Sequence, residues 1–200
     1  MENLVRWSKI SWISISILLC IIIILNITGH SRITDILQIL VWIIPLIFFI
    51  NLKKSSINES PLHTPAILGI IGYILILFHT ITLYIYWDIL YINFSESEQI
   101  LYTKYYNYYD LIIKITYIVL ICITFIKISK FMPKGQLKNA SYAIIIATIL
   151  NHLLNSFPLS LSVDIDTFMI ILNVRFIACL TIQYAVYIWF FRAFEIKMKQ

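Results

Sequence analysis

The chain has 200 residues, of which 60% are hydrophobic and 12% are charged, and its mean hydropathy is +0.88. A soluble domain of this size needs more polar surface than these residues provide, so the composition excludes a soluble globular protein. A net charge of +5 would suggest nucleic-acid binding in a soluble protein, but here the cations follow the connections between apolar stretches, and we expect no direct nucleic-acid binding.

Six apolar stretches are long enough to cross a bilayer, which takes about 20 residues in a helix. They cover residues 10–28, 36–52, 66–87, 111–128, 142–162 and 167–191. They lack the alternation of barrel strands, and backbone polar groups in lipid must be bonded internally, so the stretches predict helices. We expect an all-α fold, a polytopic transmembrane helix bundle that forms a single membrane domain over residues 1–200. Because Lys114 interrupts the fourth stretch, a bundle of four spans is the alternative.

The connections between these stretches differ in charge from one side to the other. One side carries most of the cations: Arg6, Lys9, Lys53, Lys54, Lys127, Lys130, Lys134, Lys138, Arg192, Lys197 and Lys199. The other side carries most of the acids (Asp35, Asp88, Glu96, Glu98, Asp110, Asp164 and Asp166), with only Arg32 and Lys104 as cations. This positive-inside pattern predicts a multi-pass protein of the bacterial inner (cytoplasmic) membrane with both termini in the cytoplasm. Every acid is then expected at or outside a membrane boundary.

Three of the predicted spans carry polar residues at a similar depth. This candidate intramembrane polar layer consists of His79 in the third span, Asn151, His152 and Asn155 in the fifth, and Asn173 and Arg175 in the sixth. At ~1.5 Å per residue, counting from the span ends places His79, His152 and Arg175 about 12–17 Å below the outer boundary. Such a layer can bind an anion, relay protons or hold the charge of a partner.

Each part of this layer has a structural and a functional interpretation. Arg175 is the most costly member, since a cation at that depth costs roughly 2.5–3.5 kcal/mol on insertion scales, and it is either a structural arginine or part of a binding site. The polar face of the fifth span, which also includes Thr148 and Ser156, predicts either interhelical hydrogen bonds or the lining of a pore or ligand cavity. Lys114 lies one turn after Asp110, which predicts an i, i+4 ion pair at the outer boundary.

The two sides also offer candidate surfaces for partners. The outward segment over about residues 89–110 contains Glu96, Glu98, Tyr102, Tyr105, Tyr106, Tyr108 and Tyr109. Because tyrosine favours the headgroup region, the preferred interpretation is a segment that lies on the outer leaflet, and the alternative is a recognition surface. On the other side, Lys53, Lys54, Lys130, Lys134 and Lys138 form a candidate docking face for an acidic protein or an anionic lipid.

The chain lacks the motifs of common membrane enzymes and pumps, with no HExxH, GxSxG, P-loop or GxGxxG. We therefore expect that the protein is not an enzyme and that it holds no catalytic residue, cofactor or metal. The two histidines inside predicted spans also permit bis-histidine haem ligation, which is a further alternative.

The chain is rich in Ile, Asn, Lys and Tyr and has almost no soluble part. In size, composition and topology it resembles the membrane subunits of anti-phage defence systems such as Kiwa, and also the immunity proteins against pore-forming colicins. The first resemblance implies a non-enzymatic sensor, anchor or protective subunit that works as a homo-oligomer or with a cytoplasmic protein partner. The second implies capture of a toxin's pore domain within the membrane. A small channel or transporter, with its path around Arg175 and His152, is the remaining alternative.

Overall fold

The structure is a computed structural model that describes residues 2–28, 31–56, 60–86, 94–131, 135–156 and 165–199. This part of the chain forms six helices and no strand: α1 (Glu2–Ile27), α2 (Ser31–Ser55), α3 (His63–Ile85), α4 (Glu96–Phe131), α5 (Gln136–Ser156) and α6 (Ile165–Lys199). All six are long and apolar enough to cross a membrane. The predicted all-α bundle with six spans is confirmed, and the chain is a multi-pass membrane protein.

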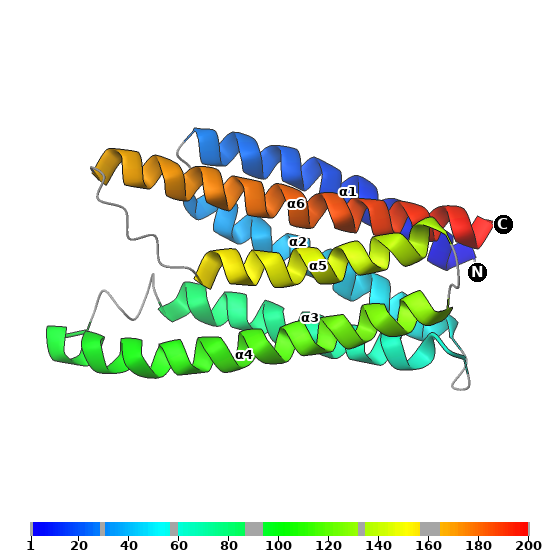
Figure 1. The fold of residues 1–200 in the computed structure, drawn as a ribbon, viewed down its shortest axis with the longest axis horizontal. Coiled ribbons are helices and arrows are strands. Elements are labelled where there is room, and N and C mark those ends of the chain that lie inside the picture. Colours follow the sequence, from blue (N-terminus) through cyan, green and yellow to red (C-terminus); the bar gives the residue numbers. More distant parts are fainter. Residues whose placement is uncertain are drawn as a thin grey trace.

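The helices form a closed ring, in which each packs against its neighbours along the chain and α6 packs against α1. Seen from the side, α4, α5 and α6 make one layer in front of a second layer of α3, α2 and α1 (Figure 1). Successive helices run in opposite directions, so both termini lie at the same end of the bundle (Figure 1). We call this the terminal end, and the opposite end, where α4 begins, the distal end.

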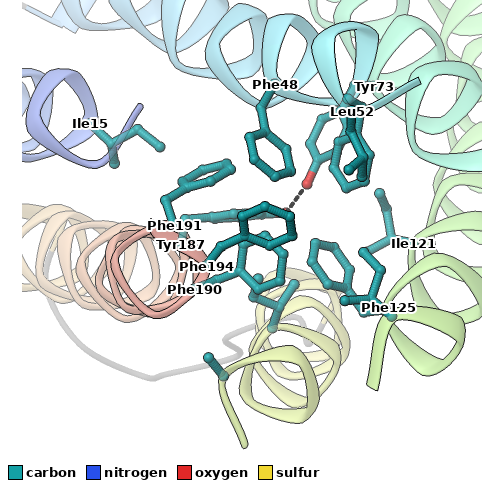
Figure 2. Close-up of a cluster of buried hydrophobic side chains, with 14 of the residues drawn as sticks. Ile15, Phe48, Leu52, Tyr73, Ile121, Phe125, Tyr187, Phe190, Phe191 and Phe194 are labelled. Carbon is teal, nitrogen blue, oxygen red and sulfur yellow. Dashed lines mark hydrogen bonds between the residues drawn. The ribbon is translucent and has the colours of Figure 1, made fainter. Parts of the chain in front are cut away.

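Aromatic side chains fill the space between the two layers (Figure 2). The ring of Phe48 on α2 meets three rings of α6, with centroids 6.0 Å from Phe190, 4.8 Å from Phe191 and 5.1 Å from Phe194. Phe125 on α4 lies 5.0 Å from Phe190, and all five rings are fully buried. Helices in lipid associate mainly through such close packing, because the lipid tails are as apolar as the side chains. At this level the centre of the ring is filled.

Gly69 lets α3 approach α2 closely. A Cβ atom at Gly69 would lie 2.5 Å from Cδ1 of Phe49 on α2, which is closer than two carbon atoms pack. Phe49 also stacks on Tyr73, one turn further along α3, with the ring centroids 5.5 Å apart. The absent side chain thus provides the space for a large one, as small residues do at many helix interfaces in membranes.

All six helices begin before the predicted spans, and α4 begins earliest relative to its span. Its span was expected over residues 111–128, whereas the helix runs from Glu96 to Phe131 and has 36 residues. Hydropathy marks only the part of a helix that fits lipid, and at ~1.5 Å per residue α4 is about 54 Å long, against about 30 Å of hydrocarbon. Residues 96–110 belong to the same helix as the span, and the first part of this segment extends past the end of α3 (Figure 1), so it is not the separate segment on the leaflet surface that we expected.

A capping box starts α4 at the distal end. The carboxylate of Glu98 accepts a hydrogen bond from the backbone N–H of Ser95 at 2.9 Å and a second one from the Ser95 hydroxyl. This Ser-x-x-Glu arrangement satisfies a donor that would otherwise be free at a helix start. Glu98 therefore has a structural role, whatever it contacts outside the chain.

Candidate functional site

A buried polar cluster joins α3 and α4 in the distal half of the bundle. His79 is 4% exposed, and its Nε2 lies 3.0 Å from Oδ1 of Asp110. The second carboxylate oxygen, Oδ2, accepts a hydrogen bond of 2.7 Å from Nζ of Lys114. The predicted pair of Asp110 and Lys114 is confirmed, and the same carboxylate also holds the imidazole of the neighbouring helix.

The contact with His79 fixes the position of Asp110 relative to α3. Its partner His79 is six residues before Ile85, the last residue of α3, and thus about 9 Å below that helix end. Asp110 lies at the same level, between α3 and its own helix. The expectation that every acid lies at or outside a membrane boundary stays a prediction.

The imidazole of His79 is held at one nitrogen only. Its Nδ1 is buried and has no hydrogen-bond partner in the described part of the chain. The ring of Tyr109 packs beside it, with a centroid distance of 5.9 Å. With Nε2 as the donor, the imidazole forms one hydrogen bond, to the carboxylate of Asp110 on the neighbouring helix.

His152 reaches the same region from α5. Its ring packs edge-on against Tyr117 of α4, with centroids 5.9 Å apart. It also lies within electrostatic range of Lys114, Asp110 and His79. The structure thus brings together two members of the predicted polar layer, His79 and His152, and adds to them a carboxylate and an ammonium group that were not assigned to it.

The other members of the predicted layer have different surroundings. Asn151 donates a hydrogen bond from Nδ2 to Oε1 of Gln183 on α6, so this part of the α5 face connects two helices. Asn173 is exposed and Arg175 is half-buried on α6. The side chain of Asn155 lies outside the described part of the structure.

A layer of hydroxyl groups continues this polar region toward the centre of the bundle. Tyr73 on α3 donates a hydrogen bond of 2.8 Å to the hydroxyl of Tyr187 on α6, across the centre of the ring (Figure 2). The hydroxyls of Tyr117 and Thr148 lie close to that of Tyr187, although they miss hydrogen-bond geometry. Because Tyr117 also contacts His152, polar side chains follow one another from the distal half to the filled centre.

Several of these residues were not anticipated from the sequence. Tyr73 and Tyr187 look like ordinary tyrosines in apolar helices, and only the fold brings them together. Glu195 on α6 accepts a hydrogen bond of 2.8 Å from the indole of Trp12 on α1 and is also bound by Lys199. The i, i+4 spacing of Glu195 and Lys199 was the one local signal that pointed to part of this arrangement.

The tyrosines of the distal part of α4 differ in their exposure. Tyr106 is buried and stacks on Tyr86 of α3, with centroids 4.4 Å apart. Tyr102, Tyr105 and Tyr108 are exposed, and Tyr105 is 65% accessible. Among the candidate recognition residues, these three tyrosines and Glu98 are thus exposed, while the side chain of Glu96 lies outside the described part.

At the terminal end, four of the five candidate docking lysines lie on described helices. Lys53 and Lys54 are exposed at the end of α2, and Lys130 is exposed at the end of α4. Lys138 is half-buried in the first turns of α5, and Lys134 lies outside the described residues. The three exposed lysines thus lie on two helices, α2 and α4, at the same end of the bundle.

The polar cluster around Asp110 offers hydrogen bonds and charge, but few side chains that could coordinate a metal. In the described ranges, no three side chains of His, Cys, Asp and Glu come together as a metal site. His79 uses Nε2 for Asp110, so in this arrangement it does not present that nitrogen to a haem iron. No known protein family, curated protein or solved structure matches the chain.

Proposed function

We propose that the protein is a non-enzymatic sensor or anchor of the bacterial inner membrane, with both termini in the cytoplasm, that acts through protein contacts at its two ends. The observation that supports it is the filled centre of the helix ring. A solute path along the ring axis would have to pass the fully buried rings of Phe48, Phe125 and Phe190. The two ends, by contrast, carry exposed side chains of different character.

The connection between the two ends is a single helix. α4 runs without interruption from the exposed tyrosines at the distal end to Lys130 at the terminal end. In the proposed function, a contact at Tyr105 and Tyr108 shifts α4 against α3. The cluster around Asp110 joins these two helices, so its contacts change with that shift. The exposed lysines, which face the cytoplasm in this topology, then present the change to an acidic partner protein.

In the cell, the proposed role is that of a membrane subunit in anti-phage defence. This part rests on the resemblance in size, composition and topology. The test is a phage challenge of a host that carries the gene with its neighbouring genes, complemented with wild type or with a Lys53→Glu/Lys54→Glu/Lys130→Glu variant. We expect wild type to reduce plaque formation and the charge-reversed variant to lose this protection.

The control variant is Lys104→Glu, which reverses an exposed lysine on the distal part of α4. We expect it to protect as wild type does, provided that both variants reach the membrane in equal amounts. Equal plaque numbers with and without wild type, for every phage in a broad panel, would contradict the defence role. Equal loss in both variants would contradict the assignment of the partner to the basic end.

A small channel or proton pathway is a second candidate, favoured by the polar side chains that lead from His79 through His152 and Tyr117 to Tyr187. Opening it would require the aromatic rings to leave the centre of the ring. Reconstitution into liposomes with an internal pH or potassium reporter tests it. Flux in wild type that disappears in Tyr187→Phe or His152→Gln would support the channel and contradict the proposed function.

A further inference from the structure

A groove opens between α1 and α6 at the terminal end of the bundle, with a volume of about 430 Å³. It is lined by Glu2, Val5, Arg6 and Lys9 of α1 and by Glu195, Met198 and Lys199 of α6. On both helices these residues follow the i, i+3, i+4 spacing of one face. Two helices that pack directly against each other thus present their charged faces to one common space.

The acid inside this groove is already compensated. Glu195 is 6% exposed, and its two oxygens are taken by the indole N–H of Trp12 and by the ammonium group of Lys199. Arg6 and Lys9 are exposed, and neither forms an ion pair with a carboxylate of the described residues. Since Glu2 is the one other acid in the lining, the groove keeps a net positive charge.

The groove lies at the level where a membrane surface is expected. All charged residues of α1 are within its first eight positions, and the apolar run begins directly afterwards at Ile10. Trp12 lies just inside this boundary, where tryptophan is favoured because its ring is apolar and its N–H needs a partner. Beyond it, Ile17 and Ile24 are exposed on α1, as expected for side chains that face lipid tails.

We propose that this groove binds an anionic phospholipid, with the lipid phosphate between Arg6 and Lys9, the headgroup next to Val5 and Met198, and the acyl chains along the exposed side of α1 that begins at Ile10. An arginine and a lysine one turn apart provide several N–H donors and two charges for a phosphate. The apolar walls and the adjoining lipid-facing side of α1 favour a lipid over a soluble phosphate compound. This site is independent of the function proposed above, since it requires neither a protein partner nor a given orientation.

The test is native mass spectrometry of the delipidated full-length protein in detergent, titrated with phosphatidylglycerol, phosphatidylcholine or inorganic phosphate. We expect wild type to bind one phosphatidylglycerol more tightly than phosphatidylcholine. An Arg6→Gln/Lys9→Gln variant should bind it roughly 10- to 30-fold more weakly, given the usual contribution of a surface cation to binding of anionic lipid. The control is Lys104→Gln/Lys127→Gln, which removes two exposed cations of α4 that belong neither to the groove nor to the candidate docking lysines.

A charge-preserving variant, Arg6→Lys/Lys9→Arg, tests whether weaker binding comes from the lost charges or from a folding defect. It should keep at least roughly a third of the wild-type affinity for phosphatidylglycerol. Equal binding of the two lipids, or equal loss in the groove variant and the α4 control, would overturn the proposed site. Displacement of phosphatidylglycerol by inorganic phosphate at similar concentration would also overturn it, because the ligand would then be a soluble phosphate compound.

Discussion

The carboxylate of Asp110 determines how α3 and α4 fit together in the distal half. It binds Lys114 of its own helix and His79 of α3, and neither helix carries a second acid at that level. Because the group is only partly exposed, losing it leaves an ammonium and an imidazole without their partner in a region of low polarity. The cluster is therefore more sensitive to substitution than an ion pair on a soluble surface.

Replacement of Asp110 by Asn keeps the shape of the side chain and removes its charge. We expect the variant to be less stable by roughly 1–3 kcal/mol, a value between those of surface pairs and of fully buried pairs. The measurement is the thermal unfolding of the purified protein in detergent. Asn107→Ala, an exposed position on the same helix, is the control and should unfold as wild type does. Unchanged unfolding of Asp110→Asn would show that the cluster contributes nothing to stability.

The hydrogen bond between Tyr73 and Tyr187 crosses the filled centre. Removing either hydroxyl, in Tyr73→Phe or Tyr187→Phe, should reduce stability by about 0.5–2 kcal/mol, in the range measured for hydrogen bonds between membrane helices. Because the two hydroxyls bond to each other, the double variant should be little less stable than the less stable single variant. Strict additivity of the two effects would indicate that the hydroxyls do not interact. Tyr105→Phe, at an exposed tyrosine, is the matched control.

At the scale of the helices, the closest approach of α2 and α3 depends on Gly69. Gly69→Ala should be destabilising by about 1–3 kcal/mol, since the new methyl group overlaps the ring of Phe49. Gly72→Ala is the matched comparison, because there a Cβ would lie 3.3 Å from Cδ1 of Ile121, at the end of a flexible side chain. It should be nearly neutral or even stabilising, as alanine favours helix. A larger loss at Gly72 than at Gly69 in thermal unfolding would contradict this packing.

The helices themselves were predictable and their ends were not. Apolar runs in lipid allow only backbone bonding within the helix, which is why six spans could be placed from composition alone. The start of α4 lies far from its apolar run, and it is marked by the short signal of Ser95 and Glu98, which a hydropathy window passes over. The sequence pointed to His79 and His152 as polar residues inside the predicted spans, and the structure gives both of them contacts with α4. The contact between His79 and Asp110 was not predicted, because it depends on how α4 packs against α3.

Contacts between distant segments could not be read from periodicity. Trp12 and Glu195 are 183 positions apart, and they meet only because α6 closes the ring against α1. Tyr73 and Tyr187 likewise meet only because the ring has no central helix. The sequence shows which faces are polar, whereas ring closure determines which of them meet.

At the scale of the whole molecule, the closed ring separates two different end surfaces by a filled centre. If the centre were a water-filled path, the aromatic layer would be accessible from solution. If it is filled, the positions of this layer are hidden from both sides while the ends remain accessible. The proposed function relies on contacts at the two ends, and it therefore requires a filled centre.

Cysteine accessibility tests this central claim most directly. In a background with Cys20, Cys122 and Cys179 replaced by alanine, single cysteines at Phe48 and Phe190 are treated in native membranes with a small, water-soluble, thiol-reactive reagent, with Tyr105→Cys as the accessible control. We predict rapid labelling at position 105 and almost none at 48 and 190 until the protein is denatured. Labelling at 48 or 190 at a rate near that of the control would contradict a filled centre.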